Sequence, residues 1–101
     1  MNQQDDLHHL TIYTAQHSPL LTEDLLVYVK QALKNLPARF PGLKILDQAV
    51  HPDRVEMTLD FQRLDEDVLR VVQSFKSEVK NLAKKKSFPG DSLWQWNYED
   101  Q

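Results

Sequence analysis

The chain has 101 residues, the length of one domain, which excludes a multidomain enzyme. It contains no cysteine, so disulfides, thiolate catalysis and cysteine-based metal sites are excluded. The formal net charge of −3 does not by itself indicate a nucleic-acid binder, and 41% hydrophobic residues are typical of a globular chain. We expect a single domain over residues 1–101 with its core at about residues 7–98. Because no membrane-spanning run or secretory signal is visible, a cytoplasmic location is expected.

The first part of the chain predicts a strand and a helix. Alternation of apolar and polar residues predicts a strand over residues 8–14, which Leu7 extends. Thr22 is a favoured N-cap for the helix that follows, in which apolar residues recur at helical spacing. Pro37 either kinks or ends this helix, and Pro41–Gly42 marks the turn after it.

Two further strands are predicted to form a hairpin. The strand over residues 43–50 is expected to place Ile45 on one face and Val50 on the other. The strand over residues 55–61 alternates strictly, with its apolar residues facing inward. The turn residues 51–53 between them are so few that the two strands must run antiparallel.

A second helix and a last strand complete the pattern. Apolar residues at helical spacing predict a helix from about Asp65, which can cap it, to about Lys85. Alternation over residues 93–98 predicts a strand whose three aromatic side chains point one way. The order strand, helix, strand, strand, helix, strand predicts an α+β, ferredoxin-like βαββαβ fold. Its antiparallel sheet carries both helices on one face, so the opposite face is expected to be uncovered.

Positive charge is concentrated in one segment of the chain. Residues 70–86 carry six lysines and arginines and one acid, a local net charge of +5. The lysines that form this row are Lys76, Lys80, Lys84, Lys85 and Lys86. The row either follows a phosphate backbone or is a solvated helix face with favourable charge at the C-terminal end of the helix.

Three stretches of the chain match, in order, the motifs of a known family. The first is His-Leu-Thr-Ile at residues 9–12, followed by Ser-Pro-Leu-Leu at residues 18–21. The second is His-Pro-Asp-Arg-Val-Glu-Met-Thr-Leu at residues 51–59. The third is Val-Val-Gln-Ser-Phe-Lys-Ser at residues 71–77, followed by Leu-Trp-Gln-Trp-Asn-Tyr at residues 93–98. Together these stretches resemble the small single-tyrosine HUH transposases, in particular the REP-associated tyrosine transposases.

The resemblance implies a ferredoxin-like domain that handles single-stranded or hairpin DNA. In the family, two histidines of a His-hydrophobic-His strand bind a divalent metal that polarises the scissile phosphate. That pair aligns here with Arg54 and Glu56; an arginine stays protonated and cannot ligate, and one carboxylate holds a metal only weakly. The family's nucleophilic tyrosine lies on a helix after the last strand, and the tyrosines of this sequence do not match its position: Tyr13, Tyr28 and Tyr98.

The sequence therefore predicts a transposase-like DNA-binding domain without DNA cleavage, with no catalytic residue, no metal and no small-molecule cofactor. The expected DNA contacts are the lysine row, Arg54 and Trp96. For Arg54 the alternative is an ordinary surface arginine. For Trp96, together with Trp94 and Tyr98, the alternatives are a stacking platform for unpaired bases and a place in the core under the helices.

Two other functions stay open at this point. The uncovered sheet face or the sheet edges could join two copies, which would make the chain a protein-interaction (dimerising) module without DNA binding. A residual metal-assisted nuclease would use His51, Glu56 and one histidine of the pair His8–His9. Only one of that pair can contribute, because adjacent residues of a strand face opposite ways.

Overall fold

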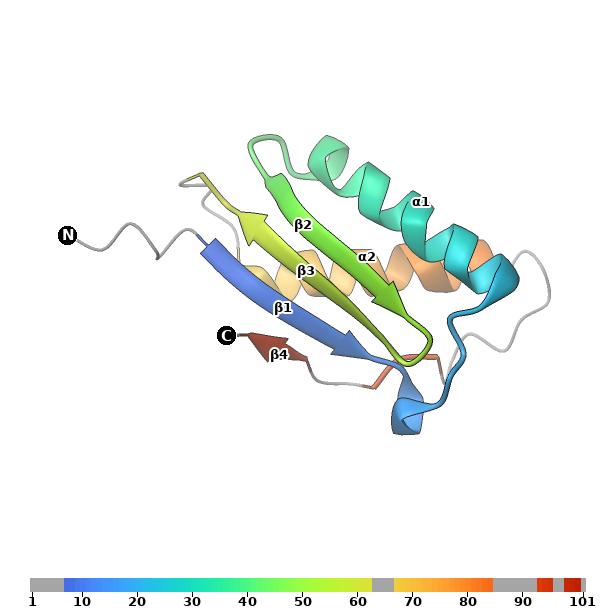
Figure 1. The fold of residues 1–101 in the computed structure, drawn as a ribbon. Coiled ribbons are helices and arrows are strands. Elements are labelled where there is room, and N and C mark those ends of the chain that lie inside the picture. The colour runs from blue at the N-terminus through green and yellow to red at the C-terminus, as the bar shows by residue number, and fades with distance from the viewer. Residues whose placement is uncertain (1–6, 63–66, 85–92, 96–97, 101) are drawn as a thin grey trace.

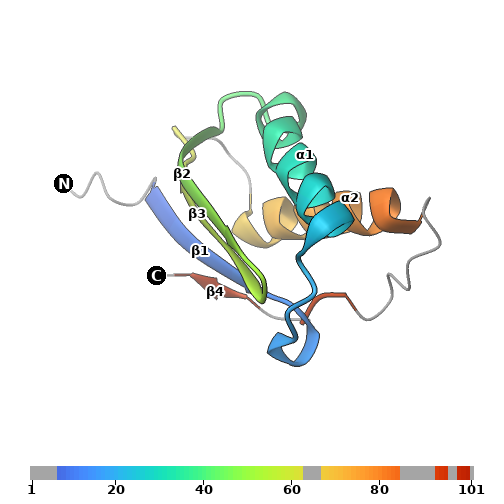
Figure 2. The same ribbon diagram turned by 45° about the vertical axis from the view of Figure 1, so that its right-hand side comes forward.

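The protein was analysed as a computed structural model, which describes residues 7–62, 67–84, 93–95 and 98–100. The elements follow one another as β1 (Leu7–Tyr13), η2 (Ala15–His17, a 3-10 turn), α1 (Glu23–Arg39), β2 (Lys44–His51), β3 (Arg54–Asp60), α2 (Val68–Lys84) and β4 (Glu99–Asp100). The sheet has the order β2-β3-β1-β4, and all neighbouring strands are antiparallel. Both helices lie on one face of this sheet (Figures 1 and 2), which is the ferredoxin-like arrangement that the sequence predicts.

The core lies between the sheet and the two helices. β1 and β3 pair along their full lengths, from Leu7 opposite Asp60 to Tyr13 opposite Arg54. Alternate residues of the two strands are buried against the helices: Leu10, Ile12, Val55, Met57 and Leu59. The helices bury Leu25, Val29, Leu33, Leu36, Val72, Phe75 and Val79 against them. The residues that alternate with these, among them His9, Thr11, Tyr13, Arg54 and Glu56, therefore line the uncovered face.

The ends of the two helices agree only partly with those that the sequence predicts. α1 continues past Pro37 to Arg39, and the turn after it places Gly42 at φ 100°, a conformation that favours glycine. α2 begins at Val68, where the Asp67 carboxylate accepts a bond of 3.1 Å from the backbone N–H of Leu69. The predicted cap Asp65 and the predicted last residue Lys85 lie outside the described residues. Neither helix in the described parts of the chain is long and apolar enough to cross a membrane.

A polar network around the buried Glu78 connects α2 to α1. Glu78 is only 7% exposed, yet its carboxylate accepts a bond from Asn35 Nδ2 at 2.5 Å and forms an ion pair with Arg39, whose Nε lies 3.1 Å from Glu78 Oε1. Arg39 Nη1 also donates to Ser74 Oγ at 3.1 Å. The flank of α2 that carries Ser74 and Glu78 therefore faces α1.

β2 contains a β-bulge, and beyond it the side chains that face the helices are the opposite set from those that plain alternation predicts. Ile45 pairs with Leu59 but Asp47 pairs with Thr58, so Leu46 is an extra residue in the ladder. Leu46 is 48% exposed, whereas Ile45 and Val50 both pack on the core. The prediction that Ile45 and Val50 face opposite ways is wrong, because the bulge adds one residue to the alternation between them.

The last strand lies further along the chain than the sequence predicts. β4 pairs with β1 only at Glu99 opposite Thr11 and at Asp100 opposite Leu10, while Trp94 forms an isolated bridge with Thr14. From the bridge to β4, five steps along this segment correspond to three steps along β1. The pairing with β1 therefore changes register between Trp94 and Glu99, and the described residues of the predicted strand, 93–95 and 98, are not part of β4; residues 96–97 lie outside the described residues.

Candidate nucleic-acid interface

The positions that the resemblance assigns to the metal ligands hold a cluster of ion pairs on the uncovered face. Arg54 Nε donates to Glu56 Oε2 at 2.9 Å, and Arg54 Nη1 donates to Asp53 Oδ1 at 2.9 Å. His51 Nε2 lies 3.6 Å from the same Glu56 oxygen. The bond from Arg54 is the main reason that the pKa of Glu56 lies below the ordinary 4.5. The same bond is the first cause that raises the pKa of Arg54.

This arrangement does not fit a divalent metal. The Arg54 guanidinium keeps its protons and occupies the Glu56 oxygen that would otherwise be a ligand. Of the two neighbouring histidines, His9 Nδ1 lies 3.0 Å from Thr58 Oγ1, and His8 Nδ1 lies 3.0 Å from Asp100 Oδ2. In the described parts of the chain, no three histidine or carboxylate side chains gather where they could hold a metal ion.

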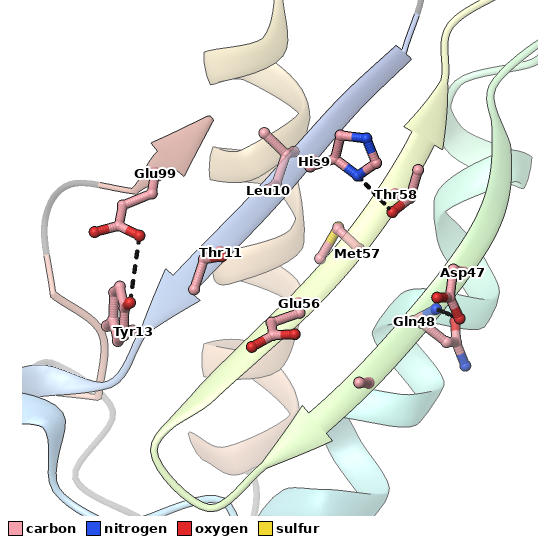
Figure 3. A pocket seen from close by; sticks show the side chains of 11 residues that line it. His9, Leu10, Thr11, Tyr13, Asp47, Gln48, Glu56, Met57, Thr58 and Glu99 are labelled. Atoms are coloured by element: carbon pink, nitrogen blue, oxygen red, sulfur yellow. Dashed lines mark hydrogen bonds between the residues drawn. The ribbon is translucent and has the colours of Figure 1, made fainter. Parts of the chain in front are cut away.

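Beside the cluster, the uncovered face is hollowed. A shallow hollow of about 400 Å³ extends over residues of all four strands (Figure 3). The carboxylates of Asp47, Glu56 and Glu99 line it, together with the rings of His9 and Tyr13. Tyr13 OH donates to Glu99 Oε1 at 3.3 Å, and the pKa of Tyr13 is raised by partial desolvation first and by Glu99 second. The hollow is therefore acidic except beside Arg54.

The described lysines of the row, Lys76, Lys80 and Lys84, belong to α2, which lies on one face of the sheet (Figure 2), whereas Arg54 stands on the other face, in alternation with the buried Val55. Lys76 Nζ donates to the backbone oxygen of Gln95 at 2.7 Å, and partial burial lowers the pKa of Lys76. Lys80 is half-buried and Lys84 is exposed. The other predicted DNA contacts lie outside the described residues: Lys85, Lys86 and Trp96.

The two basic features meet around the β4 edge of the sheet. Gln95, which Lys76 contacts, also donates its backbone N–H to the oxygen of Tyr13 at 3.0 Å. Tyr13 stands directly opposite Arg54 in the β1–β3 pairing.

The described aromatic residues of the C-terminal segment pack on the core. Trp94 and Tyr98 are half-buried, and the Trp94 ring lies 5.7 Å from the Phe75 ring of α2. For these two residues the geometry favours the core alternative over a stacking platform. A different aromatic pair, which the sequence missed, lies at the end of β1, where the ring of His17 stacks on Tyr13.

Comparisons with known proteins place the fold. No protein-family model and no curated protein matches the chain. A protein assigned as a transposase from Deinococcus radiodurans R1 aligns with a TM-score of 0.75 and 19% identity, covering 94% of this chain and 76% of that one. A REP-associated tyrosine transposase bound to a REP hairpin aligns with a TM-score of 0.74 and 15% identity, covering 95% of this chain. The fold is that of these transposases.

The likeness to these two structures confirms the resemblance to transposases that the three sequence stretches indicate. At 15% and 19% identity, the likeness shows the fold alone. This chain covers 55% of the REP-associated tyrosine transposase, so it spans about half the length of that protein. What the chain does must therefore be argued from its own side chains.

Proposed function

We propose that this chain is a transposase-like DNA-binding domain that binds single-stranded or hairpin DNA in the cytoplasm without cleaving it. The observation that carries the proposal is the ion pair between Arg54 and Glu56 at the positions of the metal ligands. Metal-assisted cleavage needs a Lewis acid beside the scissile phosphate, and here an arginine is bonded to the carboxylate instead.

Arg54 is suited to holding a phosphate rather than activating it. Its guanidinium has five N–H groups, and the bonds to Glu56 and Asp53 use two of them. The others can donate to phosphate oxygens in the forked geometry that arginine provides. Because the guanidinium stays protonated, these N–H groups remain donors without a metal.

The lysine row supports DNA binding because protein contacts to phosphates come mainly from lysine and arginine. α2 concentrates this charge on one element of a chain whose net charge is negative. One of the similar solved structures is a transposase bound to a REP hairpin. A hairpin with a single-stranded tail is therefore the first DNA to offer this chain.

The test is fluorescence anisotropy with a labelled hairpin that carries a single-stranded tail. Between about 50 and about 200 mM salt we expect affinity to fall steeply, because each phosphate contact releases counterions. Replacing Lys80 and Lys84 by glutamine should lower the slope of log affinity against log salt by about 2. The matched control removes two exposed charges from the other helix, Lys30→Gln with Lys34→Gln, and should leave the slope unchanged.

Manganese separates binding from cleavage in the same assay. We expect added manganese to leave affinity unchanged and the DNA intact, since the Arg54–Glu56 pair does not fit a metal. Manganese-dependent strand cleavage would instead support the residual nuclease that uses His51 and Glu56. Absence of binding at low salt would contradict the proposal and favour the dimerising module, which sedimentation would then detect.

A further inference from the structure

Two neighbouring residues between β1 and α1 hold a strained backbone. Gln16 has φ 55° and His17 has φ 54°, in the left-handed region that residues other than glycine avoid. Such strain persists only where the surrounding structure enforces it, and it gathers at binding sites and active sites. The question is what this conformation achieves here.

Thr14 enforces the conformation of this loop. Its hydroxyl donates to the backbone oxygen of Ser18 at 2.6 Å, and its backbone N–H donates to the oxygen of Asp53 at 3.0 Å. The backbone N–H of His17 donates back to the oxygen of Thr14 at 3.0 Å. The loop is thus tied to the end of β1 and to the β2–β3 turn, both of which belong to the rigid sheet.

The strained loop places the His17 ring against the Tyr13 ring. The two rings are nearly parallel, with centroids 4.3 Å apart and an interplanar angle of 11°. His17 is exposed, whereas Tyr13 is half-buried on the sheet. The pair therefore presents an aromatic surface to solvent. The stacked Tyr13 ring and the bonds of Thr14 to the loop backbone fix the orientation of this surface.

Arg54 stands beside this aromatic surface. It lies opposite Tyr13 in the β1–β3 pairing, and its charge acts on the Tyr13 hydroxyl. An aromatic face next to a guanidinium with unused N–H groups matches the two parts of a nucleotide, a flat base and a phosphate. The Asp53 and Glu56 carboxylates that are bonded to Arg54 repel further phosphates around it, so this corner suits one phosphate and not a run of them.

We infer that His17, held on Tyr13, is a stacking platform for one unpaired nucleobase of bound DNA, with Arg54 donating to the phosphate of that nucleotide. The inference rests on the proposed function and adds a site to it. Gln95 contacts both Tyr13 and Lys76 at the β4 edge. We therefore expect a tail that passes Lys76 at this edge to continue towards the His17 ring.

The experiment crosses a protein change with a DNA change. Anisotropy is measured for the unchanged chain and for His17→Ala, each with hairpins in which one abasic site is moved through the tail, nucleotide by nucleotide. One tail position should lose affinity about fivefold to a hundredfold when it becomes abasic, the range for a stacked base. His17→Ala should weaken the intact DNA similarly, and combining it with that abasic site should cost little more. His17→Phe, which keeps a flat ring, should restore most of the affinity.

The outcomes separate this site from the proposed function. If the unchanged chain binds with steep salt dependence but His17→Ala binds equally well, the stacking site is overturned and the proposed function stands. Additive losses from His17→Ala and the abasic site would also overturn the site, because two partners in contact must couple. If the unchanged chain fails to bind at low salt, both fall. Unfolding midpoints of the variants show whether a loss of affinity comes from loss of folding.

Discussion

At the scale of single residues, Arg54 and Glu56 decide what chemistry the uncovered face can perform. The two side chains stand on the same face of β3, two residues apart, where paired ligands could hold a metal. The guanidinium of Arg54 donates to the Glu56 carboxylate at 2.9 Å, so this carboxylate is not free to bind a metal. These two residues therefore say more about the function of this face than the other residues that line the hollow.

We expect Arg54→Gln to raise the pKa of Glu56 towards the ordinary 4.5, because the bond from Arg54 is the main cause that lowers it. A carboxyl whose pKa is lowered by folding stabilises the folded state above its unfolded pKa. That stabilisation is lost as pH falls through the folded pKa, so the unchanged chain should lose it below pH 4.5. The measurement is a carbon-13 NMR titration of the side-chain carboxyls, with Glu56→Gln identifying the resonance. An identical Glu56 titration in both proteins would contradict the pairing.

The candidate site was predictable from the sequence only where a motif carried it. The motif register located Arg54 and Glu56, and helical spacing located the lysines of α2. The stack of His17 on Tyr13 left no such signal, because it depends on two left-handed residues in a loop without glycine. Tertiary bonds from Thr14 impose that conformation, and no local propensity reports them.

At the scale of elements, β2 shows how one extra residue changes the exposure of a whole strand. Leu46 is the bulged residue and points away from the core, although the plain alternation of its neighbours does not reveal this. β2 is also an edge strand, and a bulge there disrupts the regular ladder that a second copy would need for pairing.

The bulge predicts opposite outcomes for two adjacent substitutions. Leu46→Asp should change the unfolding free energy by less than about 0.5 kcal/mol, since the side chain is exposed. Ile45→Asp should cost about 2 kcal/mol or more, because it places a charge against the core. Urea denaturation followed by circular dichroism measures both. Equal losses for the two variants would mean that β2 lacks the bulge in solution.

The elements themselves were largely predictable because their patterns are local. Alternation identified β1 and β3 with their inward faces, and helical spacing identified α1 and α2. Alternation did not predict β4, which begins at Glu99, nor the change of register against β1 between Trp94 and Glu99. Glu78 was also missed as a buried residue, because its burial depends on Asn35 and Arg39 from the other helix.

At the scale of the whole molecule, positive charge and negative charge lie on different layers. Lys76, Lys80 and Lys84 belong to the helical layer, whereas among the described residues the uncovered face carries more carboxylates than cations. The carboxylates of that face and its turn are Asp47, Asp53, Glu56, Asp60 and Glu99, against the cations Lys44 and Arg54. Under the proposed function, we expect this charge distribution to steer DNA towards α2 and towards the edge beside it.

Neutralising acids on the uncovered face should consequently tighten DNA binding without adding a contact. Asp47→Asn with Asp60→Asn keeps the side-chain oxygens that accept bonds from Gln48 and Gln62. We expect roughly twofold tighter binding at about 50 mM salt and no change at about 200 mM, since added salt screens charges beyond about 10 Å. Salt-series anisotropy with the labelled hairpin checks this. Weaker binding would place the DNA against these carboxylates.

The pairing of β1 with β4 also determines how this fold can be joined to other chains. His8 near the start of β1 and Asp100 at the end of β4 are in side-chain contact at 3.0 Å. Both lie at the end of the sheet away from Tyr13 and the β2–β3 turn (Figure 1). The start of β1 and the end of β4 thus lie side by side. The domain can therefore be inserted into a loop of another protein, or attached to a surface, with the end of the sheet at the β2–β3 turn left accessible.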